Sequence, residues 1–269
     1  MPETPPTADL ARYIRQVAYP RLGEAGQRRL MQSTALVAGC GALGSMLATM
    51  LVRAGVGRVR LVDDDVVETH NLQRQFLFTE RHARDAVPKV VAAAEVLRQA
   101  NSTVAIEPLV ARIDGRNVIE LCEGVDVIVD GLDNFPSRYV VNDAAVKRGL
   151  PWVTGGVVGA EGQAMTVLPG ETACLRCLMP ECPSPGSVPT CDDVGILGPA
   201  MATIAALEGI EAMKILAGHR DDTSRQLTVV ELWDARIRQI DISQLRDQAD
   251  CPCCKHGRFE FLRGESQDQ

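Results

Sequence analysis

The sequence predicts an α/β protein with a mostly parallel sheet and helices on both of its faces. Three observations support this fold class. Short apolar runs alternate with helical segments up to about residue 155, a glycine-rich loop joins the first run to the next helix, and several late segments are strand-like. This alternation is typical of Rossmann-type folds, in which right-handed crossovers bring the carboxyl ends of the strands to one edge of the sheet, where ligands bind.

The expected elements follow from apolar runs and from their periodicity. The run 34–38 ends at Gly39 and is typical of a buried strand, whereas apolar residues in 89–100 recur at helical spacing. The expected strands are 34–38, 59–62, 104–109, 126–130, a fifth that begins at 151–154, 163–168, 227–232 and 237–242. The expected helices are 42–54, 89–100, 137–148 and 199–217, and the proline-rich residues 179–194 are expected to form a long loop.

Composition and charge argue against several classes of protein. The chain has 269 residues and a formal net charge of -7, which does not suit a nucleic-acid binder that works through general positive charge. It contains no run of about 18 apolar residues, so no membrane partner is expected. Nine cysteines, five of them in two tight clusters, favour metal binding in a reducing cytoplasm over disulfides.

The glycine-rich loop after the first strand predicts a phosphate site. Gly39, Gly41, Ala42 and Gly44 form its small-residue framework, and backbone N–H groups can approach a phosphate at the start of the following helix. Asp63 ends the next strand, where an acidic residue usually holds ribose hydroxyls. A tight turn without a ligand is the alternative, and the motif by itself does not choose between a dinucleotide and ATP.

Polar residues after the second strand favour a triphosphate. Arg74 and Lys89 can supply the cationic charge that such a group needs, although each alone also fits a solvated surface charge. The amides of Asn71 and Gln75 flank Arg74. The segment therefore predicts phosphate contacts beside the glycine loop.

Asp133 and Asn134 follow the fourth expected strand. At the carboxyl end of a buried strand, Asp133 is placed to ligate Mg²⁺ beside phosphates. The alternative is that Asp133 caps the next helix.

Two pairs of cysteines predict a structural zinc site. Cys174 and Cys177 form one C-x₂-C knuckle, and Cys251 and Cys254 form a second. Four thiolates in tetrahedral geometry suit a closed Zn²⁺ site, which would belong to a C-terminal β-rich part of the fold. Cys253 is an extra thiol that can replace either Cys251 or Cys254, and this choice stays open.

Cys191 ends the proline-rich loop, directly before the long apolar helix. A cysteine near a helix N-terminus can be nucleophilic, but a non-catalytic thiol fits this position equally well.

Together these motifs resemble the ubiquitin-activating-enzyme-like adenylyltransferases of the ThiF/MoeB/HesA group. The resemblance extends from about residue 10 to residue 255. The matching segments are Arg12–Gln16, Gly39–Gly44, Asp63, Asn71–Gln75, Lys89, Asp133–Tyr139, Cys174–Cys177, Thr190–Cys191 and Cys251–Cys254.

The resemblance implies an ATP-dependent enzyme that adenylylates the C-terminal carboxylate of a small ubiquitin-like carrier protein ending in Gly-Gly. Asp63 would bind ribose, Asp133 would bind Mg²⁺, and Arg15 would enter the active site of the neighbouring subunit in a homodimer. Cys191 would accept the acyl group or its sulfur, and any sulfur donor would be a separate protein. The phosphates would be held and polarised by Asn71, Arg74, Gln75 and Lys89, next to Asn134.

One adenylation domain is expected over residues 10–255. Residues 10–155 would bind the nucleotide, and residues 156–255 would bind the carrier and zinc, with 179–194 as a crossover loop. Residues 1–9 and 256–269 are expected to be tails, the first of them disordered.

Two functions from other classes remain as alternatives. An NAD-dependent oxidoreductase would share the glycine loop and Asp63, but it leaves Arg74, Lys89 and the cysteine knuckles unexplained. A non-catalytic scaffold for a ubiquitin-like protein would not need the charged set. The sequence leaves the carrier and its pathway open, among thiamine, molybdopterin, tRNA thiolation and others.

Overall fold

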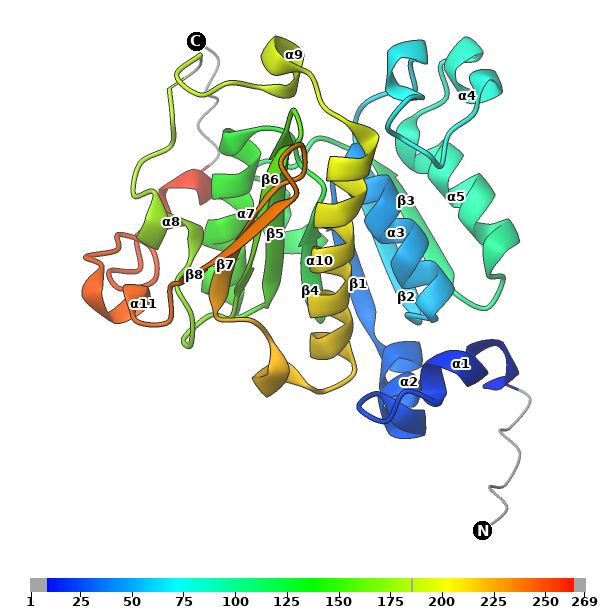
Figure 1. Ribbon diagram of the computed structural model, residues 1–269, viewed down its shortest axis with the longest axis horizontal. Helices are drawn as coiled ribbons and strands as arrows, with labels where there is room; N and C mark the ends of the chain where they lie inside the picture. Colours follow the sequence, from blue (N-terminus) through cyan, green and yellow to red (C-terminus); the bar gives the residue numbers. More distant parts are fainter. Residues whose placement is uncertain (1–8, 185, 264–269) are drawn as a thin grey trace.

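An eight-stranded sheet forms the centre of the molecule, in the order β3-β2-β1-β4-β5-β6-β7-β8 (Figure 1). The structure is a computed structural model that describes residues 9–184 and 186–263. The strands are β1 (Thr34–Ala38), β2 (Arg58–Asp63), β3 (Ala105–Val110), β4 (Val127–Asp130), β5 (Trp152–Val158), β6 (Glu161–Val167), β7 (Gln226–Glu231) and β8 (Arg236–Asp241). Strands β1 to β5 pair in parallel, and β5 to β8 pair antiparallel.

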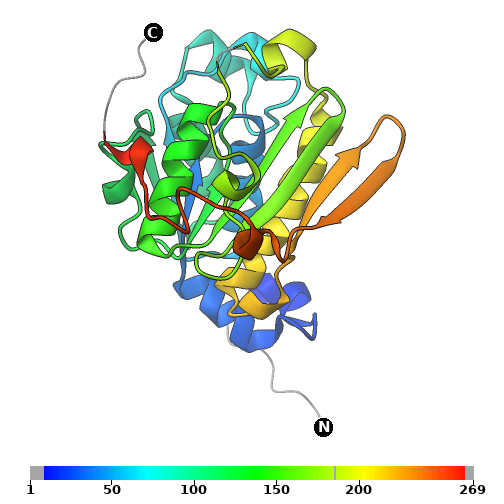
Figure 2. The same ribbon diagram turned by 90° about the vertical axis from the view of Figure 1, so that its left-hand side faces the viewer.

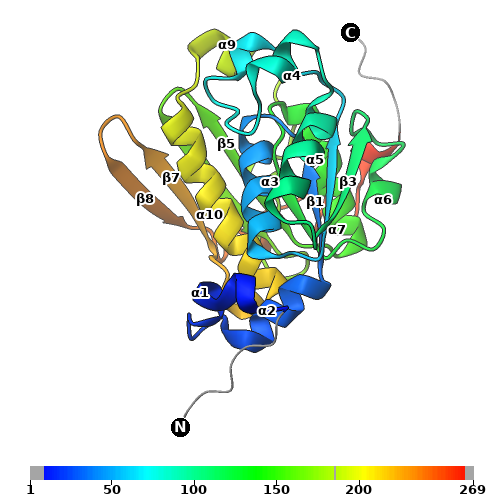
Figure 3. The ribbon, with the colours of Figure 1, turned by 90° about the vertical axis from the view of Figure 1, so that its right-hand side faces the viewer.

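Helices cover both faces of the sheet, which confirms the predicted fold class. Helices α3, α5 and α10 lie on one face (Figure 3), and α6, α7 and α8 lie on the other. The helices are α1 (Ile14–Val17), α2 (Gly23–Gln32), α3 (Ala42–Ala54), α4 (Glu80–Arg84), α5 (Lys89–Ala100), α6 (Val118–Leu121), α7 (Phe135–Arg148), α8 (Leu175–Leu178), α9 (Cys191–Val194), α10 (Gly198–Leu216) and α11 (Leu245–Gln248). None of them, within the described ranges, is long and apolar enough to cross a membrane.

Strand β1 shows why the central strands are apolar throughout. Ala35 and Val37 belong to the core under α3, α5 and α10, whereas Leu36 and Ala38 belong to the core under α6 and α7. All four side chains are at most 1% exposed. A parallel strand that is buried on both faces has no solvent-facing positions, so it reads as a continuous apolar run rather than as an alternating one.

Local signals explain why the expected helix bounds agree closely with the observed ones. Helix α3 ends before Gly55, which adopts a left-handed conformation with φ of +85°. Helix α7 begins after Asn134, whose side chain accepts a hydrogen bond from the Ser137 N–H, and Gly149 follows its last residue. Such caps are encoded within a few residues and need no tertiary partner.

Helix α2 has no counterpart among the expected elements. Its buried residues are Gly26, Gln27 and Leu30, so Leu30 is the only large apolar side chain that it buries. The apolar periodicity on which a helix prediction depends is therefore weak. Helix α9 turns the last residues of the expected 179–194 loop into one helical turn. The short helices α1, α4, α6, α8 and α11 also have no counterpart among the expected elements.

The antiparallel end of the sheet confirms the expected C-terminal β-rich part. Strands β7 and β8 form a hairpin that stands out from the body of the molecule (Figure 2). Every residue of β8 is exposed, so this strand lies at an open edge of the sheet.

Residues 256–263, which the sequence assigns to a tail, are packed against the domain. The Phe261 ring lies 5.0 Å from the Tyr139 ring and 5.2 Å from the Arg176 guanidinium carbon. The Phe261 N–H also donates to Asp143 Oδ2 at 3.2 Å. The Phe259 ring also lies 5.8 Å from Lys147 Nζ. The segment contains only a short run of apolar residues, so the sequence gives no periodic signal for it. Residues 1–8 and 264–269 of the two expected tails lie outside the described residues.

Candidate active site

The glycine loop lies at the carboxyl edge of the parallel strands, the upper edge in Figure 1. It connects β1 to α3, and Asp63 and Asp130 end the two strands on either side of β1. The Gly39 N–H donates to Val62 O at 2.8 Å, and the Gly131 N–H donates to Ala38 O at 2.7 Å. The ends of three neighbouring strands are therefore tied together where the first helix begins.

Close backbone packing requires Gly39 and Gly44, whereas Gly41 borders open space. A Cβ on Gly39 would lie 2.6 Å from Gly131 O, and a Cβ on Gly44 would lie 1.9 Å from Gly39 O. A Cβ on Gly41 would meet nothing nearer than 3.9 Å, where Gln75 Nε2 and Gly131 O lie. The space before Gly41 is consequently available to a ligand, which fits the predicted nucleotide site.

Asp63 is held rigidly by backbone groups. Its Oδ2 accepts from the Cys40 N–H at 2.6 Å, and its Oδ1 accepts from the Asp65 N–H at 2.8 Å. Burial raises the pKa of the Asp63 carboxyl, and Lys89 opposes that rise. Each oxygen still has acceptor capacity, so the carboxylate can receive ribose hydroxyls as the sequence predicts.

The two amides have different surroundings. Asn71 is buried, and its Oδ1 accepts from the Glu68 N–H at 2.9 Å, so it shapes the turn before the site. Gln75 is 3% exposed, and its Oε1 has no hydrogen-bond partner among the described residues. A buried orphan acceptor beside the space at Gly41 is a feature that a bound ligand or water would satisfy.

The two predicted cations, Arg74 and Lys89, come from adjacent segments. The Arg74 guanidinium donates to His70 O at 3.0 Å, and no carboxylate of the described ranges lies within 4.0 Å of it. Lys89 begins α5 and is 7% exposed, and its Nζ lies 2.6 Å from Asp65 Oδ2. Arg74 thus keeps its charge available, whereas Lys89 has one carboxylate partner in the described part of the chain.

Asp133 is exposed just after β4, and it does not cap α7. The capping residue is Asn134, whose Oδ1 accepts from the Ser137 N–H at 2.9 Å while its Nδ2 donates to Asp133 Oδ1 at 3.1 Å. The alternative interpretation of Asp133 as an N-cap is therefore wrong, and its carboxylate is left with acceptor capacity for a cation.

A buried ion pair fixes the segment that carries Asp133, and the sequence did not single it out. Asp130 is fully buried, and its Oδ2 accepts from Arg138 Nε at 3.1 Å and from Thr154 Oγ1 at 2.6 Å. Arg138 Nη2 also donates to Leu132 O at 2.8 Å. Burial raises the pKa of the Asp130 carboxyl, and Arg138 opposes it. The sequence offers one signal for this pair, because Arg138 lies in the segment Asp133–Tyr139 that resembles the adenylyltransferase family.

Glu208 completes this buried cluster from the other face of the sheet. It belongs to α10, is fully buried, and neither carboxyl oxygen has a hydrogen-bond partner within the described part of the chain. A Cβ on Gly155 would lie 2.3 Å from Glu208 Oε1, so only glycine allows this approach. Burial raises the pKa of Glu208 well above its ordinary value, and the nearby Asp130 carboxylate raises it further, whereas Arg138 lowers it. Burial thus favours the protonated form of this carboxyl.

Arg15 is not brought together with the other site residues of its own chain. It is exposed on α1, at the lower end of the molecule in Figure 1. Its neighbour Tyr13 packs over Gly55, just before β2 begins at the amino edge of the sheet. A role for Arg15 in catalysis would therefore require a second copy of the chain.

The four predicted zinc ligands converge, although residues 177 and 251 are far apart in the chain. The ligand atoms of Cys174, Cys177, Cys251 and Cys254 all lie within 4.8 Å of one another, an arrangement that could hold a metal ion. Cys174 Sγ is 3.6 Å from Cys251 Sγ, and Cys177 Sγ is 3.4 Å from Cys254 Sγ. Cys253 is fully buried, and its sulfur accepts from an Asn142 amide at 3.4 Å and also interacts with Cys174.

Cys191 is the first residue of α9 and is partly buried. Its Sγ donates to Val157 O at 3.1 Å, which joins the end of the 179–194 segment to the end of β5. Thr190 caps this single turn by accepting from the Asp193 N–H. The thiol is thus held near the carboxyl end of β5.

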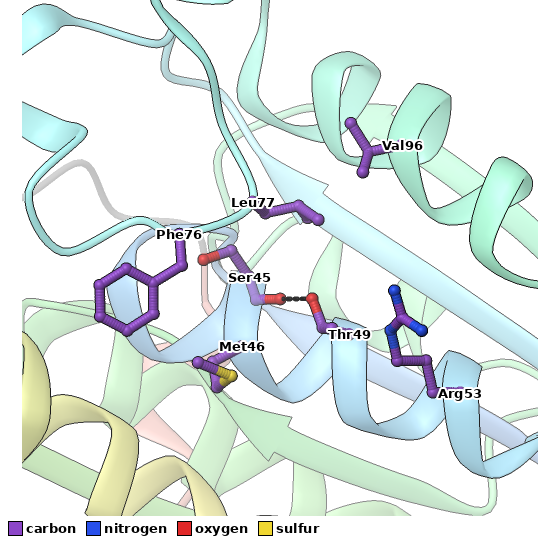
Figure 4. A pocket seen from close by; sticks show the side chains of 7 residues that line it. All are labelled: Ser45, Met46, Thr49, Arg53, Phe76, Leu77 and Val96. Atoms are coloured by element: carbon purple, nitrogen blue, oxygen red, sulfur yellow. Dashed lines mark hydrogen bonds between the residues drawn. The ribbon is translucent and has the colours of Figure 1, made fainter.

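A separate cavity of about 230 Å³ lies along the flank of α3 (Figure 4). It contains none of the predicted site residues. Within α3, the Thr49 hydroxyl donates to Ser45 O at 2.7 Å on its wall. Its lining residues are Ser45, Met46, Thr49, Arg53, Phe76, Leu77 and Val96.

Comparison with known proteins gives consistent relatives over nearly the whole chain. Residues 13–253 match the ThiF family model. The Sulfur carrier protein ThiS adenylyltransferase of Bacillus subtilis is 41% identical over 256 residues, which cover 95% of this chain and 75% of that protein. The SAMP-activating enzyme E1 of Haloferax volcanii is 41% identical over 255 residues, which cover 94% of this chain and 92% of that protein. A crystal structure of E. coli MccB with MccA-N7isoASN superposes with a TM-score of 0.77 at 21% identity, covering 95% of this chain and 75% of that chain, which supports the fold alone.

Proposed function

The chain belongs to the ThiF family, and on this premise we propose that it uses ATP to adenylylate the C-terminal carboxylate of a small ubiquitin-like carrier protein, releasing pyrophosphate. The observation that carries the proposal is the group of nucleotide-binding features at one edge of the sheet. These features are the open space at Gly41, the Gln75 amide oxygen that bonds to no described residue, the Asp63 carboxylate held by two backbone N–H groups, and the cations Arg74 and Lys89.

The proposed reaction needs no general base, because the attacking carboxylate is already an anion. A carrier oxygen forms a bond to the α-phosphorus of ATP, the bond from that phosphorus to the bridging oxygen breaks, and pyrophosphate leaves with the electron pair. The protein contributes alignment and charge neutralisation. We assign ribose to Asp63 and the phosphates to Arg74, Gln75 and Lys89, with Asn71 and Asn134 shaping the segments around them.

Two metals are part of the proposal. The exposed Asp133 carboxylate, held beside the nucleotide features by the Asp130–Arg138 pair, would ligate Mg²⁺ together with phosphate oxygens. Zn²⁺ is the metal that four converging thiolates suit best, with a structural role that ties the 174–177 knuckle to the 251–254 knuckle. Mg²⁺ supplies charge neutralisation on the phosphates when bound.

The remaining parts of the proposal involve partners. Arg15 lies at the opposite edge from its own site. We propose a homodimer in which it reaches the site of a second copy. We assign Cys191, whose Sγ donates to Val157 O near the carboxyl end of β5, as the acceptor of the acyl group or of a sulfur delivered by a separate donor protein. The oxidoreductase and scaffold alternatives receive no support from the matched relatives, which are named as adenylyltransferases or activating enzymes.

Carrier-dependent exchange of radioactive pyrophosphate into ATP tests the proposal. Small proteins of the source organism that end in Gly-Gly are supplied one at a time, and the adenylated carrier is identified by its mass. Exchange with one carrier, and none with the same carrier lacking its last glycine, is expected. Absence of exchange with every carrier, together with no binding of ATP, would reject the proposed function.

A further inference from the structure

Asp65 connects the ribose end of the candidate site to its phosphate end. Its Oδ2 accepts from Lys89 Nζ at 2.6 Å, and its backbone carbonyl accepts from the Lys89 N–H at 2.9 Å. Its own N–H donates to Asp63 Oδ1, while Asp63 Oδ2 accepts from the Cys40 N–H. A continuous chain of hydrogen bonds therefore runs from the glycine loop through Asp63 and Asp65 to the ammonium of Lys89.

The backbone around Lys89 is fixed independently of the Asp65 side chain. Val66 and Pro88 form an antiparallel bridge, and the Val67 N–H donates to Val87 O at 2.9 Å. These contacts fix the position of the Lys89 Cα, but they do not fix its flexible four-carbon side chain. Without a further partner, that side chain would adopt several rotamers and place the ammonium at several positions. The carboxylate of Asp65 is the one ion-pair partner of Lys89 among the described residues.

The two side chains differ in their exposure. The Lys89 side chain is 9% exposed, whereas the Asp65 side chain is 62% exposed. The side chain of Lys89 is thus buried, and Asp65 binds its ammonium group close to solvent at the carboxyl edge of the sheet. An ammonium carries three N–H donors, so the bond to Asp65 leaves two donors for phosphate oxygens.

We propose that Asp65 is a positioning residue that holds the Lys89 ammonium in place to receive the phosphates of ATP. The inference rests on the proposed function and deepens it, because it identifies Asp65 as the residue that orients the phosphate-binding ammonium of Lys89. Removing the charge of Asp65 leaves the ammonium without its partner, and the ordering of the lysine side chain must then be supplied by ATP binding itself. ATP affinity is expected to fall for that reason.

Calorimetric binding of MgATP to the full chain, without any carrier, tests the inference. Asp65→Asn is expected to raise the dissociation constant by about tenfold, the scale of one charge-assisted contact. Asp64→Asn is the matched control, because it makes the same change in charge at an adjacent exposed position for which no hydrogen bond or ion pair is found in residues 9–184 and 186–263. This control is expected to change affinity by less than about twofold.

A double-mutant cycle separates positioning from a general structural effect. In a Lys89→Met background, Asp65→Asn is expected to cause no further loss, because Asp65 acts through the lysine. Additive losses would overturn the inference. So would tighter ATP binding by Asp65→Asn, which would make Asp65 a competitor of phosphate, or full recovery at high Mg²⁺, which would make it a cation ligand.

The experiment also distinguishes the inference from the proposed function. A wild-type chain that binds no ATP would reject both the proposed function and the inference. A wild-type chain that binds ATP, with Asp65→Asn binding it equally well, would reject the inference alone. Circular dichroism of each variant verifies that the fold is retained.

Discussion

Glu208→Gln is expected to stabilise the protein, and increasingly so as the pH rises. Glu208 is fully buried, has no hydrogen-bond partner within the described residues, and lies beside the Asp130–Arg138 pair. Asp130 and Arg138 already balance each other's charge. An ionised Glu208 would add an uncompensated charge to the interior, so burial favours the protonated carboxyl in the folded protein.

The pH dependence follows from proton binding. The pKa of Glu208 is raised in the folded state above its ordinary value of 4.5, mainly by burial and further by Asp130, while Arg138 lowers it. In the window above 4.5 and below the folded pKa, the native state binds a proton that the unfolded state has released. The free energy of unfolding therefore falls with rising pH in the wild type, by about 1.36 kcal/mol per unit, and glutamine removes this contribution.

The advantage of Glu208→Gln over wild type is expected to grow between pH 5 and pH 7, over the part of this range that lies below the folded-state pKa. Two full units at this slope set an upper limit of about 2.7 kcal/mol on that growth. For a chain of this size, the limit corresponds to an increase of about 5–10 °C in the melting-temperature advantage. Differential scanning calorimetry at both pH values measures the melting-temperature difference between Glu208→Gln and wild type. A packing difference between the acid and the amide would be the same at both pH values, so it cancels when the two differences are compared.

The control is Glu211→Gln, the same substitution one turn along α10. Glu211 pairs with Lys214 at 2.6 Å and accepts from the Ser224 N–H at 2.8 Å, so its loss is expected to bring no stability gain that grows with pH. If Glu208→Gln shifts the melting temperature equally at pH 5 and pH 7, Glu208 does not hold a proton in the folded state. The reasoning from its burial would then be refuted.

Three further outcomes test the candidate site. Lys89→Ala and Arg74→Ala are each expected to lose about tenfold or more in carrier-dependent pyrophosphate exchange, because each removes charge stabilisation from the phosphates; near-wild-type exchange in both would reject the phosphate assignment. Elemental analysis is expected to find about one Zn²⁺ per chain, and Cys177→Ser is expected to lose it and to melt at lower temperature, since metal binding is coupled to folding; a stable, metal-free wild type would contradict the zinc assignment. Cys191→Ala is expected to retain pyrophosphate exchange, which needs no thiol, and to lose a later transfer step measured by mass spectrometry; unchanged transfer would identify Cys191 as a bystander.

Much of the fold is predictable from sequence because its signals are local. The glycine at the end of α3, the Asn134 cap of α7 and the continuous apolar run of β1 each act within a few residues. Alternation of such segments is enough to predict a parallel sheet with covered faces. Helix α2 escaped prediction for the converse reason, since it buries few apolar side chains and so carries little periodic signal.

The residue types of the candidate site are also visible in the sequence, but several of their partners are not. Spacing within each cysteine pair indicated metal ligands, and the structure brings the two pairs within ligand distance and gives Cys253 a hydrogen bond from Asn142. The glycine loop predicts a phosphate site. Only the structure shows that Gly39 packs directly against the backbone of Gly131, whereas Gly41 borders open space.

Sequence patterns are enough to predict the order and type of the main elements and the side chains at the ends of the strands. Which charged groups meet depends on the folded arrangement of these elements. Lys89 forms an ion pair with Asp65, which lies 24 positions earlier in the chain. Glu208 lies near Asp130 but belongs to a helix on the opposite face of the sheet. Contacts of this kind depend on how helices pack over a sheet, and packing is a property of the whole core. No local pattern of residues encodes them.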